Sequence, residues 1–244
     1  LVIDIDYCFG DLAHALAVKP TRSLVEVFQA AGTKTAGPVF STIPVSDAGV
    51  NLLSQTGFIF QAQDPPGETV ALMDQHSIHQ KISTCLPSTF EMLRERFDVI
   101  LVDGLRNLNQ VEFDYIEQAD QLLVIGTHDV PSLRGLSKRL DFLERLAIER
   151  RDVSIVINRH TKKNRISSSV IHKAIGAEPV AYIANDFDKT HRSLNDGVPV
   201  NLLFPKSRLA EDIANLATVV FGVVVGEKGE VSKRDRIRKL LSRR

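Results

Sequence analysis

The feature that most limits the possible folds of this 244-residue chain is the regular alternation of short apolar runs with longer helical stretches. Several of these runs are β-branched and almost continuously apolar, as expected of parallel strands that helices cover on both faces. The pattern predicts strands at residues 1–6, 57–62, 98–103, 121–127, 153–158 and 179–183.

Helical periodicity fills the intervals between these strands. It predicts helices near residues 23–31, 77–96, 109–118, 132–149, 167–175, 188–195 and 207–222. Such alternation is typical of a three-layer, doubly wound α/β fold with a mostly parallel sheet, in which functional groups gather at the carboxyl ends of the strands. Residues 32–56 are rich in Gly, Thr, Ser and Pro and are predicted to form a surface loop.

Charge is unevenly distributed, although Lys plus Arg and Asp plus Glu are 30 each. Residues 233–244 hold seven basic residues and one Asp, a net charge of +6, which leaves 23 basic and 29 acidic residues in residues 1–232, a net charge of −6. We therefore expect one domain over residues 1–222 and a basic tail over residues 223–244. Three uses of the segment from Lys233 to Arg244 stay open: contact with an anionic membrane, contact with a protein partner, or a solvated end.

Neither the cysteines nor the apolar runs indicate a secreted or membrane-spanning protein. Cys8 and Cys85 share no CxxC or Cys/His spacing, so neither a disulfide framework nor a zinc site is indicated. No apolar run approaches the roughly 20 residues that span a bilayer, and the amino terminus lacks a signal-peptide pattern. The cytoplasm is the expected location.

Three aspartates close predicted strands. Asp4 and Asp6 end the first strand, and Asp103 ends the third. A carboxylate at such a strand end can hold Mg²⁺ through water or orient an attacking water molecule. Two other interpretations stay open: ordinary residues that end a strand, and the acidic residue that binds a ribose hydroxyl in dinucleotide enzymes, which needs a GxGxxG motif that the sequence lacks.

A phosphate-binding loop of the form G-x-x-x-x-G-K-[ST] is also absent from the sequence. The segment from Gly32 to Thr35 comes nearest, but its Gly and Lys are not adjacent and it follows a predicted helix.

Five motifs, in order, resemble those of MinD/ParA-type P-loop ATPases, and the Phe9-Gly10-Asp11 ending of the first is most similar to the TadZ/CpaE branch, which acts in the assembly of Flp/Tad pili. The resemblance extends from residue 1 to about residue 220. The motifs are LVIDIDYCFGDL (1–12, the A′ or switch I region), FDVILVD (97–103, Walker B), ADQLLVIGT with VPSLR (119–127 and 130–134), IVINR (155–159, the hhxNR strand) and AYIAND with NDGVP (181–186 and 195–199, the IPND…NxGxP segment).

The resemblance implies roles for the aspartates. Asp6 would position the attacking water and sense the γ-phosphate, and Asp4 would act with it and support the Mg²⁺ shell. Asp103 would be the Walker B carboxylate that holds Mg²⁺ through water.

The resemblance also implies a nucleotide-base site. Asn158 would read the adenine edge, because its amide offers both a donor and an acceptor, and Arg159 follows it in the same motif. Ala184 and Asn185 would flank the base together with Asp186, which would also begin the next helix as its N-cap.

The family pattern leads us to expect further chain upstream, because the first strand, the Lys-containing phosphate loop and its helix would precede residue 1 by roughly 30 residues. The sequence departs from the pattern at Ala184, where Pro is usual, and at Gly104-Leu-Arg, where Leu-Pro follows Walker B. ATP hydrolysis is expected to be slow or absent, and to require an upstream P-loop.

The partners and location implied by the resemblance are those of a localisation and assembly factor. They are ATP or ADP with Mg²⁺ as cofactors, a homodimer, proteins of the pilus secretion machinery, and a cytoplasmic position at a pole or at the inner face of the membrane. Two alternatives stay open: a polar scaffold without hydrolysis, and a ParA-like DNA-partitioning ATPase. The acidic charge of residues 1–232 argues against the second.

Overall fold

The computed structural model describes residues 1–6, 10–31, 33, 36–54, 75–106, 110–148, 152–161 and 166–222. The chain divides into two compact units, one of Leu1–Ala119 with Ser193–Pro199 and one of Asp120–Arg192 with Val200–Arg244. Among the described residues, each unit contains one three-stranded sheet.

The sheet of the first unit has the strand order β2–β1–β3. The central strand, β1 (Val2–Asp4), pairs in parallel with β2 (Leu52–Ser54) and with β3 (Leu101–Asp103). Ile3 at the centre of β1 is completely buried, as expected of a strand that is covered on both sides. The central position of β1 therefore places its last residue, Asp4, in the middle of the carboxyl edge of the sheet.

Helices that pack around this sheet enclose an aromatic core. Ser23 starts one of them with a capping box, in which its hydroxyl accepts the Glu26 N–H and the Glu26 carboxylate accepts the Ser23 N–H. The rings of Phe28, Phe90 and Tyr115 meet edge to face, with ring centroids 6.2–6.5 Å apart. The helices are α1 (Leu12–Ala15), α2 (Leu24–Ala30), α3 (Ala36–Phe40), α4 (Gln75–Arg94) and α5 (Gln110–Glu117).

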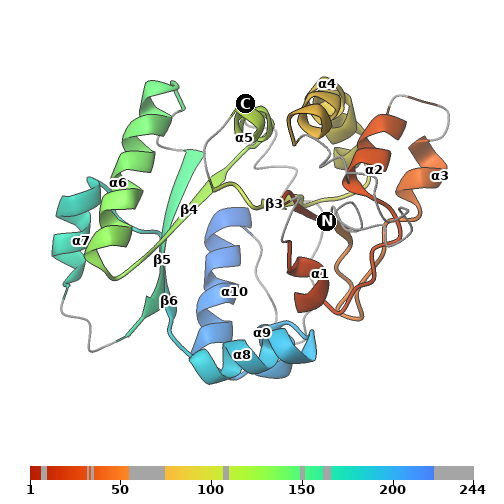
Figure 1. The fold of residues 1–244 in the computed structure, drawn as a ribbon. Helices are drawn as coiled ribbons and strands as arrows, with labels where there is room; N and C mark the ends of the chain where they lie inside the picture. Colours follow the sequence, from red (N-terminus) through yellow and green to blue (C-terminus); the bar gives the residue numbers. More distant parts are fainter. Residues whose placement is uncertain are drawn as a thin grey trace, which may run out of the picture. The chain divides into compact units, whose positions relative to one another are not determined.

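The second unit has a parallel sheet in the order β4–β5–β6. Alternate residues of β5 face two apolar clusters: Ile155 and Ile157 pack with residues of α6 and α7, whereas Val156 packs with Leu209 of α10. In Figure 1, α6 and α7 accordingly lie on one side of this sheet and α10 on the other. The elements are β4 (Leu122–Thr127), α6 (Val130–Arg145), β5 (Val153–His160), α7 (Ser168–Ile175), β6 (Ala181–Ala184), α8 (Phe187–Asp196), α9 (Val200–Leu203) and α10 (Arg208–Phe221).

The predicted α/β class with parallel strands is confirmed, since every strand pair in the described residues is parallel. The prediction of a surface loop over residues 32–56 is wrong. This stretch contains α3 and the strand β2, and Phe40, Leu52 and Leu53 are buried in it. Its Gly and Pro content indicated a loop, but three large apolar side chains are enough to anchor two short elements to the core.

Several expectations concern residues whose structure is outside the described ranges. They include the strand at residues 57–62, Cys8, and the basic tail, so the boundary at residue 222 stays a prediction. None of the helices in the described ranges is long and apolar enough to cross a membrane.

Candidate functional site

Asp4 occupies the centre of the carboxyl edge of the first sheet. Strand register places it opposite Ser54 on β2 and Asp103 on β3. Asp4 is 2% exposed, whereas Asp103 is exposed. The Asp6 N–H donates to Asp4 Oδ1 at 3.0 Å, but Asp4 Oδ2 is buried without a hydrogen-bond partner among the described residues. A buried carboxylate oxygen without a partner is unusual and indicates a place for a cation or a donor.

The surroundings of Asp4 disfavour its charge. Burial is the main cause that raises the pKa of the Asp4 carboxyl, and the negative charges of Asp103 and Asp6 add to the rise, while the backbone N–H groups of Asp6 and Leu12 oppose it. A bound cation would relieve both the burial cost and the repulsion between carboxylates.

These residues fit Mg²⁺, which prefers oxygen ligands and keeps several water molecules. The described ranges contain no group of three or more His, Cys, Asp or Glu side chains that could hold a metal ion by themselves. Phosphate oxygens and water would therefore have to complete the coordination beside Asp4 and Asp103.

Substitution of Asp4 by Asn is expected to stabilise the ligand-free chain at pH 8. Because the Asp4 pKa is higher in the folded than in the unfolded chain, stability falls as the pH rises through the folded-state value, and Asn removes this loss. We expect the Tm to rise by about 2–4 °C, the shift that about 1 kcal/mol gives in a chain of this size. Thermal unfolding without Mg²⁺ should show this gain shrinking as the pH falls, and disappearing below about pH 4, where Asp4 becomes protonated in both states.

The exposed Asp47 provides the control, since Asp47→Asn should leave the Tm unchanged over the same pH range. A lower Tm for Asp4→Asn than for the natural chain at pH 8 would contradict the interpretation of Asp4 as a destabilising buried charge.

Asp6 lies two residues beyond β1 and pairs with Arg106. Arg106 Nη1 is 3.3 Å from Asp6 Oδ2, and the two side chains are 65% and 18% exposed. Glycine at position 104 allows the backbone after β3 to pass close to Asp6. Its φ is +108°, and a Cβ there would lie 3.0 Å from the Asp6 nitrogen. The Gly104-Leu-Arg departure from the family pattern thus places a cation beside Asp6. An exposed pair of this kind is worth about 0–1 kcal/mol, so a ligand can displace it.

Gly10 also belongs to this site, although its residue type and motif predicted no role for it. The Gly10 N–H donates to the Asp6 carbonyl oxygen at 3.1 Å. A Cβ at Gly10 would lie 2.4 Å from Asp4 Oδ2 and 2.9 Å from the Asp6 carbonyl oxygen, closer than any side chain tolerates. The sequence feature that could have indicated this role is the glycine in the Phe9-Gly10-Asp11 ending. Because glycine has no Cβ, the backbone can pass close to the Asp4 carboxylate.

The predicted base site lies in the second unit. Asn158 is opposite Thr127 in the β4–β5 ladder, and its Oδ1 accepts the Arg159 N–H at 2.7 Å. An amide oxygen has two lone pairs, so Asn158 retains an acceptor and its two N–H donors for a ligand. Arg159 has a φ of +53°, a left-handed conformation that is uncommon for a residue with a side chain.

The end of β6 lies beside the end of β5. His160 is the register partner of Ala184, and the Asn185 N–H donates to the His160 carbonyl oxygen at 2.8 Å. The Ala184 N–H donates to Asp212 Oδ2 at 2.9 Å, and Arg208 Nε lies 2.7 Å from the other oxygen of Asp212. This role of Asp212 was not predicted from the sequence. The feature that could have indicated it is an acidic residue among the apolar positions of α10.

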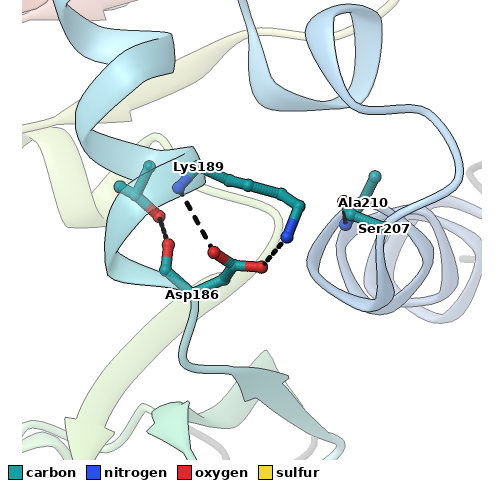
Figure 2. Close-up of polar contacts among 5 residues, drawn as sticks. Asp186, Lys189, Ser207 and Ala210 are labelled. Carbon is teal, nitrogen blue, oxygen red and sulfur yellow. Dashed lines mark hydrogen bonds and ion pairs between the residues drawn. The ribbon is translucent and has the colours of Figure 1, made fainter.

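Asp186 caps helix α8, as predicted. Its Oδ1 accepts the Lys189 N–H at 3.2 Å, and its Oδ2 is paired with Lys189 Nζ (Figure 2). The hydrogen bond from the Lys189 side chain is the main cause that holds the pKa of Asp186 below its ordinary value. Asp186 is therefore ionised at neutral pH and already has two donors.

The structure thus gathers the predicted residues into two groups. Asp4, Asp6 and Asp103 lie at the carboxyl edge of the first sheet. The second group, in the second unit, consists of Asn158 and Arg159 at the end of β5 and Ala184, Asn185 and Asp186 at and after the end of β6.

Comparison with known proteins identifies the fold. No family model matches the chain. Over 131 residues the chain is 24% identical to the septum site-determining protein MinD of Thermotoga maritima, a region that covers 52% of this chain and 48% of that protein. The chain therefore spans about half the length of this curated relative.

Solved structures match over a longer part of the chain. A ParA family ATPase from Chlorobium tepidum superposes with a TM-score of 0.72 and 22% identity, covering 88% of this chain and 84% of that one. MinD from Pyrococcus horikoshii, solved in complex with Mg-ADP, gives a TM-score of 0.66 and 16% identity, covering 90% and 82%. The chain thus has the α/β fold of MinD/ParA-type ATPases.

Proposed function

We propose that this chain is an ATP-binding, dimerising factor of the TadZ/CpaE type that localises or assembles a Flp/Tad pilus machine in the cytoplasm. The observation that carries the proposal is the buried Asp4 carboxylate, one oxygen of which has no hydrogen-bond partner among the described residues, and which lies between Ser54 and Asp103 at the carboxyl edge of a parallel sheet. In doubly wound α/β folds this edge is where ligands bind.

Gly10 supports the branch within the family. The Phe9-Gly10-Asp11 ending is the motif most similar to TadZ/CpaE proteins. The close approach of Gly10 to Asp4 explains why this position needs a glycine. The branch assignment therefore rests on a residue that lies against the proposed phosphate site.

The three aspartates divide two tasks in the proposed site. Asp4 and Asp103 would hold Mg²⁺ through water, and bound Mg²⁺ supplies positive charge that offsets the charge of the phosphates. Asp6 is less buried than Asp4 and is paired with an exposed guanidinium, so its carboxylate can exchange Arg106 for a water molecule and orient it. Proton acceptance by a single positioned carboxylate is consistent with slow hydrolysis.

The second group would recognise the nucleotide base. Asn158 offers donors and an acceptor at the end of β5, and Ala184 and Asn185 at the end of β6 are fixed by the hydrogen bonds to Asp212 and His160. A base would therefore meet polar groups whose positions are set by the two neighbouring strands.

Replacement of Asp6 by Ala in the complete natural chain is expected to retain MgATP binding and to lower ATP turnover by at least about 100-fold, because a positioned acid or base contributes 10²–10⁴. Binding is measured by calorimetry and turnover by phosphate release. Asp47→Ala, which removes an exposed aspartate, serves as the control and should leave both unchanged. No binding of MgATP by the natural chain would overturn the nucleotide-binding proposal, and binding with equal background rates in both chains would favour the scaffold without hydrolysis.

The pilus role is tested separately in the organism that encodes the chain. Deletion of the gene should abolish Flp/Tad pili, and the natural gene should restore them whereas the Gly10→Ala gene should not. Normal pili with defective DNA partitioning would instead favour the ParA-like alternative.

A further inference from the structure

Three ring side chains meet at the carboxyl edge of the second sheet, one from each strand region. His128 follows β4, His160 ends β5, and Tyr182 lies in β6. The ring centroids are 4.8 Å apart for the two histidines, 5.2 Å for His160 and Tyr182, and 5.9 Å for His128 and Tyr182. The three rings are therefore in mutual contact, although their residues are far apart in the sequence.

A β-bulge explains why His160 faces the other two rings. The ladder pairs Ile157 with Tyr182 and His160 with Ala184, so three steps along β5 match two steps along β6. The extra residue reverses the alternation of side chains, and Arg159 adopts the left-handed backbone conformation that the bulge needs. Without the bulge His160 would point to the opposite face from Ile157 and Tyr182, because side chains alternate along a strand.

Each of the three side chains has a buried polar atom for which the described residues provide no partner. His128 Nδ1, His160 Nδ1 and Tyr182 Oη make no hydrogen bond within the described part of the chain. Buried side-chain polar atoms are nearly always satisfied, and five such atoms are orphaned in the described residues, three of them in this one cluster. A single ligand within reach of all three atoms would satisfy them.

We propose that His128, His160 and Tyr182 form a site for a divalent transition-metal ion of the Zn²⁺ type, with the histidines binding through Nδ1 and the tyrosine through Oη. Imidazole nitrogen suits Zn²⁺, Cu²⁺ and Ni²⁺ and does not suit Mg²⁺. Two imidazoles that bind one tetrahedral ion at about 2.0–2.1 Å have ring centres about 5 Å apart, which matches the 4.8 Å between His128 and His160. Water would occupy the fourth position.

This site goes beyond the proposed function and does not depend on it. Its ligands are nitrogens and a phenol rather than carboxylates, and all three belong to the second unit. A bound ion would also hold the bulge in place, and the bulge contains Asn158 and Arg159. The consequence is a metal-dependent rigidity of the segment that carries the predicted base-reading amide.

The experiment measures Zn²⁺ and Co²⁺ binding to the natural chain without an affinity tag. Calorimetry should give one Zn²⁺ per chain, and Co²⁺ should produce visible absorption bands of a four-coordinate ion. Zn²⁺ affinity should fall by at least about 100-fold in His128→Gln/His160→Gln, more than the 10- to 100-fold that loss of a mere outer-shell partner costs. His172→Gln is the matched control, because His172 lies on α7, is half-exposed and is paired with Glu178, and it should bind Zn²⁺ like the natural chain.

Two further measurements test the proposal if circular dichroism shows that the double variant is unfolded. Tyr182→Phe keeps the ring but lacks the oxygen and should weaken Zn²⁺ binding. In the natural chain, one equivalent of Zn²⁺ should shift the imidazole NMR signals of His128 and His160 and leave those of His172 unchanged. The proposal is overturned if the natural chain binds neither ion at millimolar concentration, if the folded double variant binds Zn²⁺ equally well, or if the shifted imidazole signals belong to other histidines.

Discussion

Alanine at Gly197 is expected to lower the free energy of unfolding by about 3 kcal/mol. This value is the sum of two costs: the strain of a side chain on a left-handed residue, and the overpacking of its contact with a neighbour. Gly197 has a φ of +63°, and a Cβ there would lie 2.5 Å from Ala17 Cβ and 3.0 Å from the Ala17 nitrogen. Ala17 has little freedom to move away, because its own φ is +49° and its N–H donates to the His14 carbonyl oxygen. Urea unfolding monitored by circular dichroism measures the loss.

Gly49 separates the two contributions to this loss. Its φ is +77°, but in the described part of the chain no atom lies within 4 Å of a Cβ built there. Gly49→Ala should therefore cost only the backbone term, about 1 kcal/mol. Equal losses at the two positions would show that the contact with Ala17 contributes nothing. The result also bears on the NxGxP part of the resemblance, since Gly197 is the glycine of that motif.

Alanine at Gly10 is expected to abolish Mg²⁺-dependent nucleotide binding and to lower the free energy of unfolding by about 2 kcal/mol, as overpacking at a tight contact does. The added methyl group would overlap Asp4 Oδ2 at 2.4 Å and the Asp6 carbonyl oxygen at 2.9 Å. Asp4 has a short side chain fixed by the Asp6 N–H, so the carboxylate must leave its position. Calorimetric titration with MgATP, together with urea unfolding, measures both effects.

Gly37 in helix α3 is the matched control for Gly10, because no atom of the described residues lies within 4 Å of a Cβ at that position. Gly37→Ala should leave nucleotide binding unchanged and should stabilise the helix by up to about 1 kcal/mol. Unaltered MgATP binding by Gly10→Ala would contradict the placement of the phosphate site beside Asp4.

The carboxylates of the site could be predicted from sequence because their position follows from strand periodicity. Asp4 and Asp103 each end an apolar run, and parallel strands bring such ends to one edge, where the register indeed sets them opposite each other. The helix cap at Asp186 could be predicted for a similar reason, since capping depends on residues close in sequence.

Other parts of the site depend on contacts between distant segments, which periodicity does not encode. The pairing of Arg106 with Asp6 depends on Gly104, which follows β3, has a positive φ and packs against Asp6. The contact of Asp212 with Ala184 joins residues 28 positions apart. The strand β2 was missed for another reason: it lies in a stretch whose Gly, Thr, Ser and Pro content indicated a loop.

The bulge in β5 makes the length of one short segment as important as its composition. Loss of one residue between Ile157 and His160 would restore two-residue alternation and leave the histidine on the same face as Ile157, but it would remove Asn158 or Arg159, while insertion of one would shift Ala184 away from its register partner. Neither change alters the apolar character of the strand. In a comparison of related genes, a gap at this point would therefore separate chains that keep the bulge with Asn158 and Arg159 from chains that have only the same fold.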